Sequence, residues 1–250
     1  MRSLTLTGIE GIPLISRDDD LAKIICRAAT SSGLAFQPGD ILVVCQKIVS
    51  KAEGRIKNLG TVAPSALARN HAARFDKDPR TVQLALENAN RIVRMRNGVL
   101  IVETGPGWVC ANAGVDESNS ISEETAILLP EDADASARRI RAGIKQLAGV
   151  DAAVVISDTF GRPWREGLTE ICLGISGMNP LLDLRGTNDL GGRELHHTII
   201  AIADEIASAA GLLMEKSSGI PAVLVRGYEY KLAEGNSRAL IRPAENDLFR

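Results

Sequence analysis

Aromatic residues are scarce in this sequence: Phe, Trp and Tyr make up 3% of its 250 residues, although 45% of the residues are hydrophobic. The core must therefore be built from Ala, Val, Ile and Leu. No uncharged apolar run reaches the roughly 20 residues that a membrane-spanning helix needs. Residues 1–14 also lack the apolar run and the cleavage site of a secretory signal. We therefore expect a globular protein of the cytoplasm with no membrane partner.

Charge and cysteine patterns exclude two further classes. The formal net charge is −2, without the basic excess of a general nucleic-acid binder. The densest basic cluster, Arg138, Arg139 and Arg141, is interpreted as a solvated helix face. No C-x-x-C pair occurs, so we predict buried, reduced thiols and not zinc ligands or disulfides. These cysteines are Cys26, Cys45, Cys110 and Cys172.

Several familiar catalytic motifs are also missing. The sequence has no G-x-x-x-x-G-K-[ST], no strand-anchored G-x-G-x-x-G and no G-x-S-x-G, so it supports neither a P-loop nor a Rossmann site. His71 lies in a polar helical segment and is expected on the surface. His196 and His197 are predicted to open a helix, where neighbours in sequence point to different faces, which argues against a two-histidine metal pair.

Hydrophobic periodicity predicts helices and strands that alternate irregularly, which is typical of a mixed α/β (α+β) fold. Asp18, Asp19 and Asp20 open the first helix, where acidic groups suit the helix dipole, and Ser31 to Gly33 end it. The other predicted helices are 64–75, 81–91, 134–147 and 195–213. The predicted strands are 41–44, 99–102, 109–111, 126–129, 152–156 and 221–225.

The segment 195–213 is predicted to be the longest helix. Apolar residues recur along it at helical spacing, and Ala203 and Ala207 widen the apolar face. A face this broad is expected to be deeply buried. We therefore predict that this helix lies near the interface of an obligate dimer.

Two acidic segments follow apolar strands. Asp158 follows 152–156, and the C-terminal strand edge is where α/β folds bind ligands; its carboxylate suits Mg²⁺ or Mn²⁺. The segment equally fits a capped turn in which Gly161 adopts a positive φ. Asp116 follows 109–111 and alone indicates an Asx-rich turn, but two such carboxylates in one chain favour a shared metal–phosphate site.

Three other segments are candidates for phosphate or nucleotide contacts. In residues 46–55, Lys51 and Arg55 bracket an acid and a glycine, and could offset phosphate charge or form a charged surface hairpin. The loop 10–14 contains Gly11, whose backbone could approach a base or phosphate. The polar loop 214–221 could fold over a nucleotide or merely connect two elements.

Together these segments resemble the coenzyme F420-0:L-glutamate ligase family, in collinear order over nearly the whole chain. The matching stretches are GIEGIPLI, GDILVVCQKIVSKAEGR, VCANAGVDESN, VVISDTFGRPWREG, CLGISG, GGREL, ADEIASAAGLLM, GIPAVLVRG and RPAENDLFR. The loop 214–219 departs from archaeal members because Glu215 and Lys216 replace a Gly-rich run. Pro106 stands where many bacterial members carry histidine, which affects fine substrate contacts.

The resemblance implies a fold, partners and cofactors. It implies one ligase domain over residues 1–250, with two intimate lobes, mixed sheets, packed helices and an intertwined homodimer. It implies GTP as co-substrate and Mg²⁺ or Mn²⁺ as cofactor, with K⁺ assisting in some members. The substrates would be F420-0 and L-glutamate.

The resemblance also implies roles for individual residues. Asp116, Asp158 and Thr159 match metal ligands, and Asp158 and Lys51 would be catalytic. The residues that match nucleotide contacts are Gly11, Ile12, Pro13, Leu14, Gln46, Lys47, Lys51 and Asn119, followed by Met214, Glu215, Lys216 and Ser217. The implied reaction makes a γ-linked amide through an acyl phosphate. A metal-dependent phosphohydrolase and a non-catalytic GTP-binding regulator are the alternatives.

Overall fold

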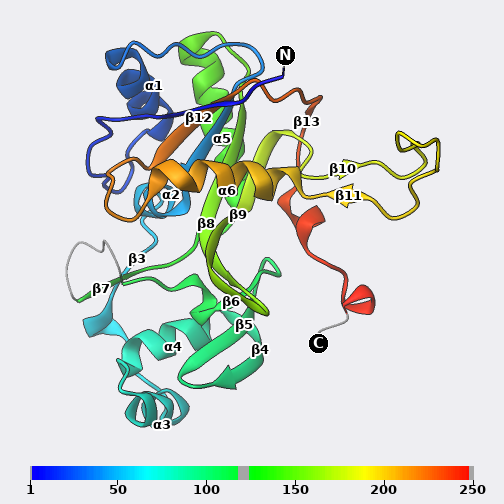
Figure 1. The fold of residues 1–250 in the computed structure, drawn as a ribbon. Helices are drawn as coiled ribbons and strands as arrows, with labels where there is room; N and C mark the ends of the chain where they lie inside the picture. The colour runs from blue at the N-terminus through cyan, green and yellow to red at the C-terminus, as the bar shows by residue number, and fades with distance from the viewer. Residues whose placement is uncertain (1, 118–123, 248–250) are drawn as a thin grey trace.

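A computed structural model of the chain describes residues 2–117 and 124–247. Figure 1 shows a main body built on one large sheet, a smaller lobe below it, and a narrow arm that projects to one side. Helices and strands alternate irregularly, and the prediction of a mixed α/β fold is confirmed. That residues 1–250 form a single ligase domain stays a prediction.

The main sheet has six strands in the order β1-β12-β2-β8-β9-β13. Strands β2 and β8 are parallel, and every other neighbouring pair is antiparallel. The bounds are β1 Thr5–Gly8, β12 Ala222–Arg226, β2 Ile41–Cys45, β8 Ala153–Arg162, β9 Arg165–Met178 and β13 Leu232–Ala233.

Helices cover both faces of this sheet. Leu42 and Val44 of β2 pack toward α1 (Leu21–Ser31) and α5 (Ala133–Ala148), whereas Ile41 and Val43 pack toward α6 (Ile202–Met214). Successive residues of a strand point to opposite faces, so a strand covered on both sides must be apolar throughout. This explains why residues 41–44 form one continuous apolar run.

The smaller lobe contains a three-stranded antiparallel sheet and two helices. Its strands are β4 (Ala89–Arg96), β5 (Val99–Thr104) and β6 (Val109–Ala111), and its helices are α3 (Ala66–Phe75) and α4 (Pro79–Glu87). The short antiparallel pair of β3 (Ile56–Asn58) and β7 (Thr125–Ile127) leads from the main body into this lobe. The predicted strands around 99–102, 109–111 and 126–129 are therefore confirmed.

Helix starts follow the expected capping chemistry. The Asp20 side chain accepts a hydrogen bond from the Lys23 backbone N–H at 3.1 Å, which satisfies a donor in the first turn of α1. Ser65, Asp78 and Asp132 cap α3, α4 and α5 in the same way. The helix predicted over 81–91 ends earlier, at Glu87, and the residues after Asn88 enter β4.

The prediction of a long helix over 195–213 is wrong in its first third. Helix α6 begins at Ile202 and has 13 residues, fewer than the 16 of α5. Ile199 and Ile200 form β11 (Ile199–Ile200), which pairs with β10 (Leu182–Asp183) in the projecting arm. The buried face of α6 packs on the main sheet of its own chain, so this face needs no second subunit to cover it.

The cysteine prediction is confirmed for free thiols, whereas two of the histidine predictions are wrong. The four cysteines are free, as predicted, although Cys26 and Cys45 are only partly buried. His71 is 5% exposed, not on the surface, with Nε2 3.3 Å from the Gly98 carbonyl oxygen. His196 and His197 lie in the arm, because the helix that they were predicted to open starts later.

The basic cluster on α5 is solvated only in part. Arg138 and Arg139 are exposed, but the Arg141 side chain is 18% exposed and its Nε donates to Asp151 Oδ1 at 2.6 Å. The Arg141 interpretation was wrong because this guanidinium finds a carboxylate beyond the end of its own helix. No helix in the described ranges has both the length and the apolar character that crossing a membrane requires.

Candidate functional site

Three segments that were singled out separately in the sequence meet at one end of the strands of the main sheet. Strands β1 and β2 end there and β12 begins there, because β12 runs antiparallel between them. The Ile9 N–H donates to the Ala222 carbonyl oxygen, and the Cys45 N–H donates to the Pro221 carbonyl oxygen, each at 2.9 Å. Loop 9–16, the segment after β2 and the loop before β12 are therefore neighbours.

The first of these segments contains the predicted nucleotide contacts Gly11 to Leu14. Gly11 has a φ of +76°, which favours glycine, and no atom lies within 4 Å of the place where a Cβ would stand. Gly11 and Pro13 line a cavity of about 360 Å³ together with α1. Ile12 anchors the loop against the core, while the Leu14 side chain is 93% exposed. Within residues 11–14, the loop is thus anchored at Ile12 and open at the others.

The second segment is a short helix, α2 (Gln46–Ala52), and the alternative of a charged surface hairpin is wrong. Gln46 is buried, and its Oε1 accepts a hydrogen bond from Ser50 Oγ at 2.8 Å. Lys47 and Lys51 are four residues apart and so share one side of the helix. Burial and the nearby Lys47 charge lower the pKa of Lys51. Two neighbouring ammonium groups of this kind favour an anion beside them.

Lys47 also joins the main body to the segment that carries Asp116. Its Nζ lies 2.8 Å from Asp116 Oδ2, and the two side chains are 15% and 29% exposed. Asp116 is held in place by reciprocal backbone hydrogen bonds with Ile127 of β7. The preceding turn is strained, since Asn112 and Ala113 both have positive φ values. Backbone strain and pairing therefore position this carboxylate. Asn119 lies outside the described residues.

Asp158 lies within a strand and not at its end. Strand β8 continues past it and Gly161 pairs with Leu168 of β9, so the alternative of a capped turn is wrong. A register shift between Ile156 and Ser157 gives a bulge just before Asp158. Burial, together with the nearby carboxylates of Glu170 and Asp116, raises the pKa of Asp158 to about 7 against the opposing effects of the Thr159 N–H and Lys47.

Thr159 lies beside Asp158 in sequence, but its side chain has a different surrounding. Adjacent residues of a strand point to opposite faces. Thr159 Oγ1 donates a hydrogen bond to Glu170 Oε1 on β9, whereas Asp158 shares its face with Phe160, which packs against Cys110. Within residues 2–117 and 124–247, no three His, Cys, Asp or Glu side chains gather closely enough to form a metal cage by themselves.

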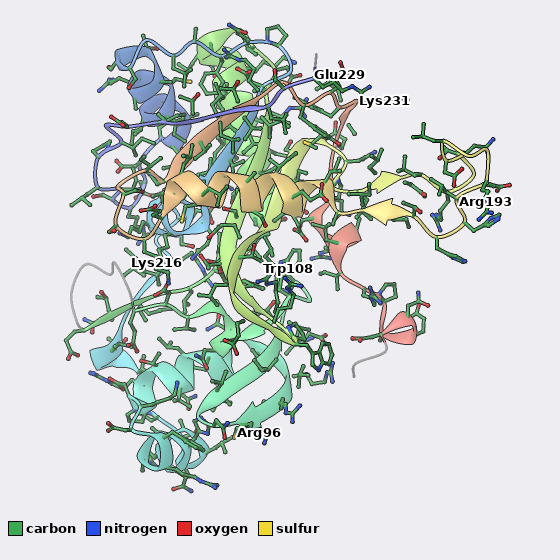
Figure 2. All side chains as sticks on the ribbon, viewed as in Figure 1. Arg96, Trp108, Arg193, Lys216, Glu229 and Lys231 are labelled. Atoms are coloured by element: carbon green, nitrogen blue, oxygen red, sulfur yellow. The ribbon has the colours of Figure 1, made fainter. Side chains whose placement is uncertain are left out.

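The third segment of this region is the loop that starts at Met214 and leads to β12. Met214 is buried, with its Sδ 3.9 Å from Ser157 Oγ. Glu215 has a φ of +28°, and Glu215, Lys216 and Ser217 are exposed. Figure 2 shows Lys216 beyond the end of α6, on the side that faces α2 and the smaller lobe. Three of the four predicted contacts in this loop are therefore accessible to a ligand.

Sequence reasoning missed Glu170. It lies opposite Thr159 in the β8–β9 pairing, and its Oε2 is buried without a hydrogen-bond partner among the described residues. It also missed a cavity of about 350 Å³ between the smaller lobe and the start of α5, which Trp108 and Thr104 line. No local pattern marks these residues, because strand pairing and lobe packing bring them together.

The oxygen donors of this region fit a divalent cation. The orphaned, buried carboxylate oxygen on Glu170 favours a positive charge nearby, and so does Asp158, whose pKa is raised by burial and by the charges of Glu170 and Asp116. Mg²⁺ typically takes one or two protein carboxylates and completes its shell with water and substrate phosphates. The absence of a three-ligand cage in the described part is therefore compatible with a metal–nucleotide site.

Comparisons with known proteins agree on one family. The family model for F420-0:gamma-glutamyl ligase matches residues 10–227. A coenzyme F420:L-glutamate ligase of Methanothermobacter thermautotrophicus is 42% identical over 250 residues, covering 99% of both chains. Relatives with the same name in Methanopyrus kandleri and Archaeoglobus fulgidus are 44% and 43% identical, covering 100% and 97% of this chain and 100% and 94% of their own.

Proposed function

This chain belongs to the F420-0:gamma-glutamyl ligase family, and from that premise we propose that it attaches L-glutamate to coenzyme F420-0 with GTP as the phosphoryl donor. Similarity over the full length of both chains supports the ligase activity and a role in F420 biosynthesis. GTP and a divalent cation are the finer parts of the proposal.

One observation of the structure carries the finer proposal. Three groups from segments far apart in sequence lie at the same end of the sheet strands. They are the open loop at Gly11, the lysines of α2 and the carboxylate of Asp158. Phosphoryl transfer needs fixed positive charge beside the phosphates and a metal between them and the protein carboxylates. This arrangement supplies protein groups for both.

We assign the residues as follows. Residues 11–14 and the exposed loop 215–217 contact the nucleotide, and Lys51 faces its phosphates. Asp116 and Asp158 hold the divalent cation, Mg²⁺ or Mn²⁺, with Thr159 close by, and K⁺ is a further proposed ion. When bound, the divalent cation neutralises charge on the transferring phosphoryl oxygens.

The reaction then has two steps. A carboxylate oxygen of F420-0 attacks the γ-phosphorus of GTP, so that an acyl phosphate forms and GDP leaves. The α-amine of glutamate attacks the acyl carbon, loses a proton and displaces inorganic phosphate, leaving a γ-linked amide. Lys51 holds positive charge near the phosphates in the first step, where negative charge shifts toward the leaving GDP. The protein's main contribution is position and electrostatics.

We expect GTP to be used in preference to ATP. The preference follows from family membership, and no single described side chain accounts for it. Initial rates of ligation with each nucleotide at equal, subsaturating concentration would measure it. Equal rates with ATP would show that the preference does not extend to this chain.

We also propose that the protein is a homodimer, with the β10–β11 arm at the interface. The arm projects from the body, and Leu190 at its tip is fully exposed while Leu182 and Ile199 are about 40% exposed. A projecting arm with exposed leucines is costly to leave in water. Light scattering at micromolar concentration is expected to give the mass of a dimer.

A charge on the arm tests this assignment. Leu190→Lys is expected to shift the dimer toward monomer, whereas Leu147→Lys, on exposed α5 surface, is expected to leave the mass unchanged. A monomeric mass for the unmodified protein would contradict the dimer. An unaffected Leu190→Lys dimer would contradict only the role of the arm tip.

The two alternatives, a phosphohydrolase and a GTP-binding regulator, can be told from a ligase by the substrates that must be present before GDP is released. A phosphohydrolase would release GDP from GTP without F420-0 or glutamate, and a regulator would bind GTP without turnover. A ligase is expected to release GDP only when F420-0 is present and to complete turnover only with glutamate. Measuring GDP release with each substrate omitted in turn separates the three.

A further inference from the structure

Glu170 has an environment that the proposed roles leave unexplained. Its two carboxylate oxygens are treated differently: Oε1 accepts the hydrogen bond from Thr159 Oγ1, while Oε2 is buried and has no hydrogen-bond partner in the described part of the chain. A buried carboxylate oxygen without a donor is costly, because it has lost its water and gained nothing in return. A purely structural Glu170 would therefore weaken the fold.

The side chain is nevertheless held firmly in this place. Helix α6 approaches β9 closely at Gly211, where an added Cβ would lie 2.6 Å from Glu170 Cγ. Ser208, one turn earlier on α6, donates from Oγ to the Glu170 carbonyl oxygen at 2.8 Å. The Thr159 hydroxyl fixes the carboxylate from the other side. The backbone of Glu170, its aliphatic side-chain carbons and Oε1 are thus held in place, and only Oε2 is left for another partner.

The neighbour of Glu170 favours a cation as that partner. Its Oε1 contacts Thr159, which matches a metal ligand of the family, so Oε2 lies beside a predicted metal-binding residue. A buried carboxylate oxygen without a hydrogen-bond donor is the kind of ligand that Mg²⁺ and Mn²⁺ prefer.

We propose that Glu170 is a ligand of the divalent cation, supplying a carboxylate oxygen, with Thr159 and Gly211 as the residues that position it. This inference rests on the proposed metal-dependent function and adds a carboxylate to the predicted set of Asp116, Asp158 and Thr159. Strand pairing across the β8–β9 hairpin, and not sequence proximity, puts Glu170 opposite Thr159, one member of that set.

The test is the binding of Mn²⁺ to the full-length protein, followed by electron paramagnetic resonance of the free ion, without substrates. Glu170→Gln keeps the size of the side chain and an oxygen that can accept from Thr159, but removes the charge. It is expected to weaken Mn²⁺ binding at least about tenfold. The control is Glu166→Gln, which removes an exposed carboxylate from the same strand and is expected to bind Mn²⁺ like the unmodified protein.

Thermal unfolding supplies a second readout, because a purely structural role for Glu170 predicts a lower Tm for Glu170→Gln and a metal-binding role does not. Without metal, Glu170→Gln is expected to melt no lower than the unmodified protein, because it loses a buried, unpaired charge, and its Mn²⁺-induced rise in Tm is expected to shrink. Unchanged Mn²⁺ affinity, or a clearly lower Tm without metal, would overturn the assignment of Glu170 alone. Failure of the unmodified protein to bind Mn²⁺, with or without GTP, would overturn the metal-dependent function as well.

Discussion

Asp158→Asn is expected to lower the rate of ligation by about a thousandfold or more, while the protein still folds. Asp158 is partly buried, and burial together with the charges of Glu170 and Asp116 raises its pKa, so a carboxylate is disfavoured there unless a cation is bound. Asparagine keeps the shape of the side chain but cannot offer a negatively charged oxygen. Loss of one charged ligand of a catalytic metal removes about 4 kcal/mol of transition-state stabilisation, which corresponds to that factor.

The thermal stability of Asp158→Asn shows whether its loss of activity comes from unfolding. Since the folded pKa of Asp158 is raised from 3.8 to about 7, the folded state binds a proton more tightly than the unfolded state. Stability therefore falls as pH rises through this window and stays reduced above it. Asparagine cannot ionise, so without metal the variant is expected to melt no lower than the unmodified protein at about pH 8. Near-normal ligation by the folded variant would rule out a metal-binding role.

Lys51→Ala is expected to lower kcat/KM for GTP by about a hundredfold without a loss of stability. Lys51 is partly buried near Lys47, and like charges spaced four residues apart on a helix repel each other. Removing one ammonium relieves that repulsion, so the free energy of unfolding should change by no more than about 0.5 kcal/mol. The loss should instead appear in GTP binding and turnover.

Two variants sharpen this test. Lys51→Arg is expected to recover only part of the activity, because a planar guanidinium does not reproduce a compact point charge. Lys57→Ala removes an exposed lysine from β3 and is expected to ligate normally. If Lys51→Ala ligates at the unmodified rate under subsaturating GTP, Lys51 is an ordinary surface lysine and its assignment is wrong.

The parts of the fold that the sequence predicted well are those decided by local chemistry. Residues 41–44 had to form a strand buried on both faces because every residue in the run is apolar. The first helix begins where Asp20 can cap it, and α5 has a continuous apolar stripe between its Asp132 and Gly149 caps. Each signal lies within one segment, so no distant partner is needed to interpret it.

The errors come from partners that lie far away in sequence. Leu195 and Ile199 match the helical period of α6, but the Leu195 N–H bonds to Thr187 and Ile199 pairs with Asp183, so both join the arm. The Arg-rich residues 89–96 show little strand pattern and become a strand because β5 pairs with them. His71 is buried, and its Nε2 lies 3.3 Å from the carbonyl oxygen of Gly98, a residue of a turn that is distant in sequence.

The candidate site follows the same rule. The resemblance identified Asp116 and Asp158 by position, but sequence alone placed Asp158 at a strand end, whereas pairing with β9 extends the strand past it. That same pairing puts Glu170 opposite Thr159, which a single sequence cannot show. Lys47 was predicted as a nucleotide contact, and the structure adds its ion pair with Asp116.

The central claim, that this protein joins glutamate to F420-0, is tested most directly by mass spectrometry of the products. The reaction would contain F420-0, GTP, Mg²⁺ and L-glutamate, with each component omitted in turn. We expect a product heavier than F420-0 by glutamyl residues, with one GDP released for each glutamate added, and none without Mg²⁺. GDP formed at the same rate without glutamate and with no glutamylated product would contradict the account and indicate a phosphohydrolase.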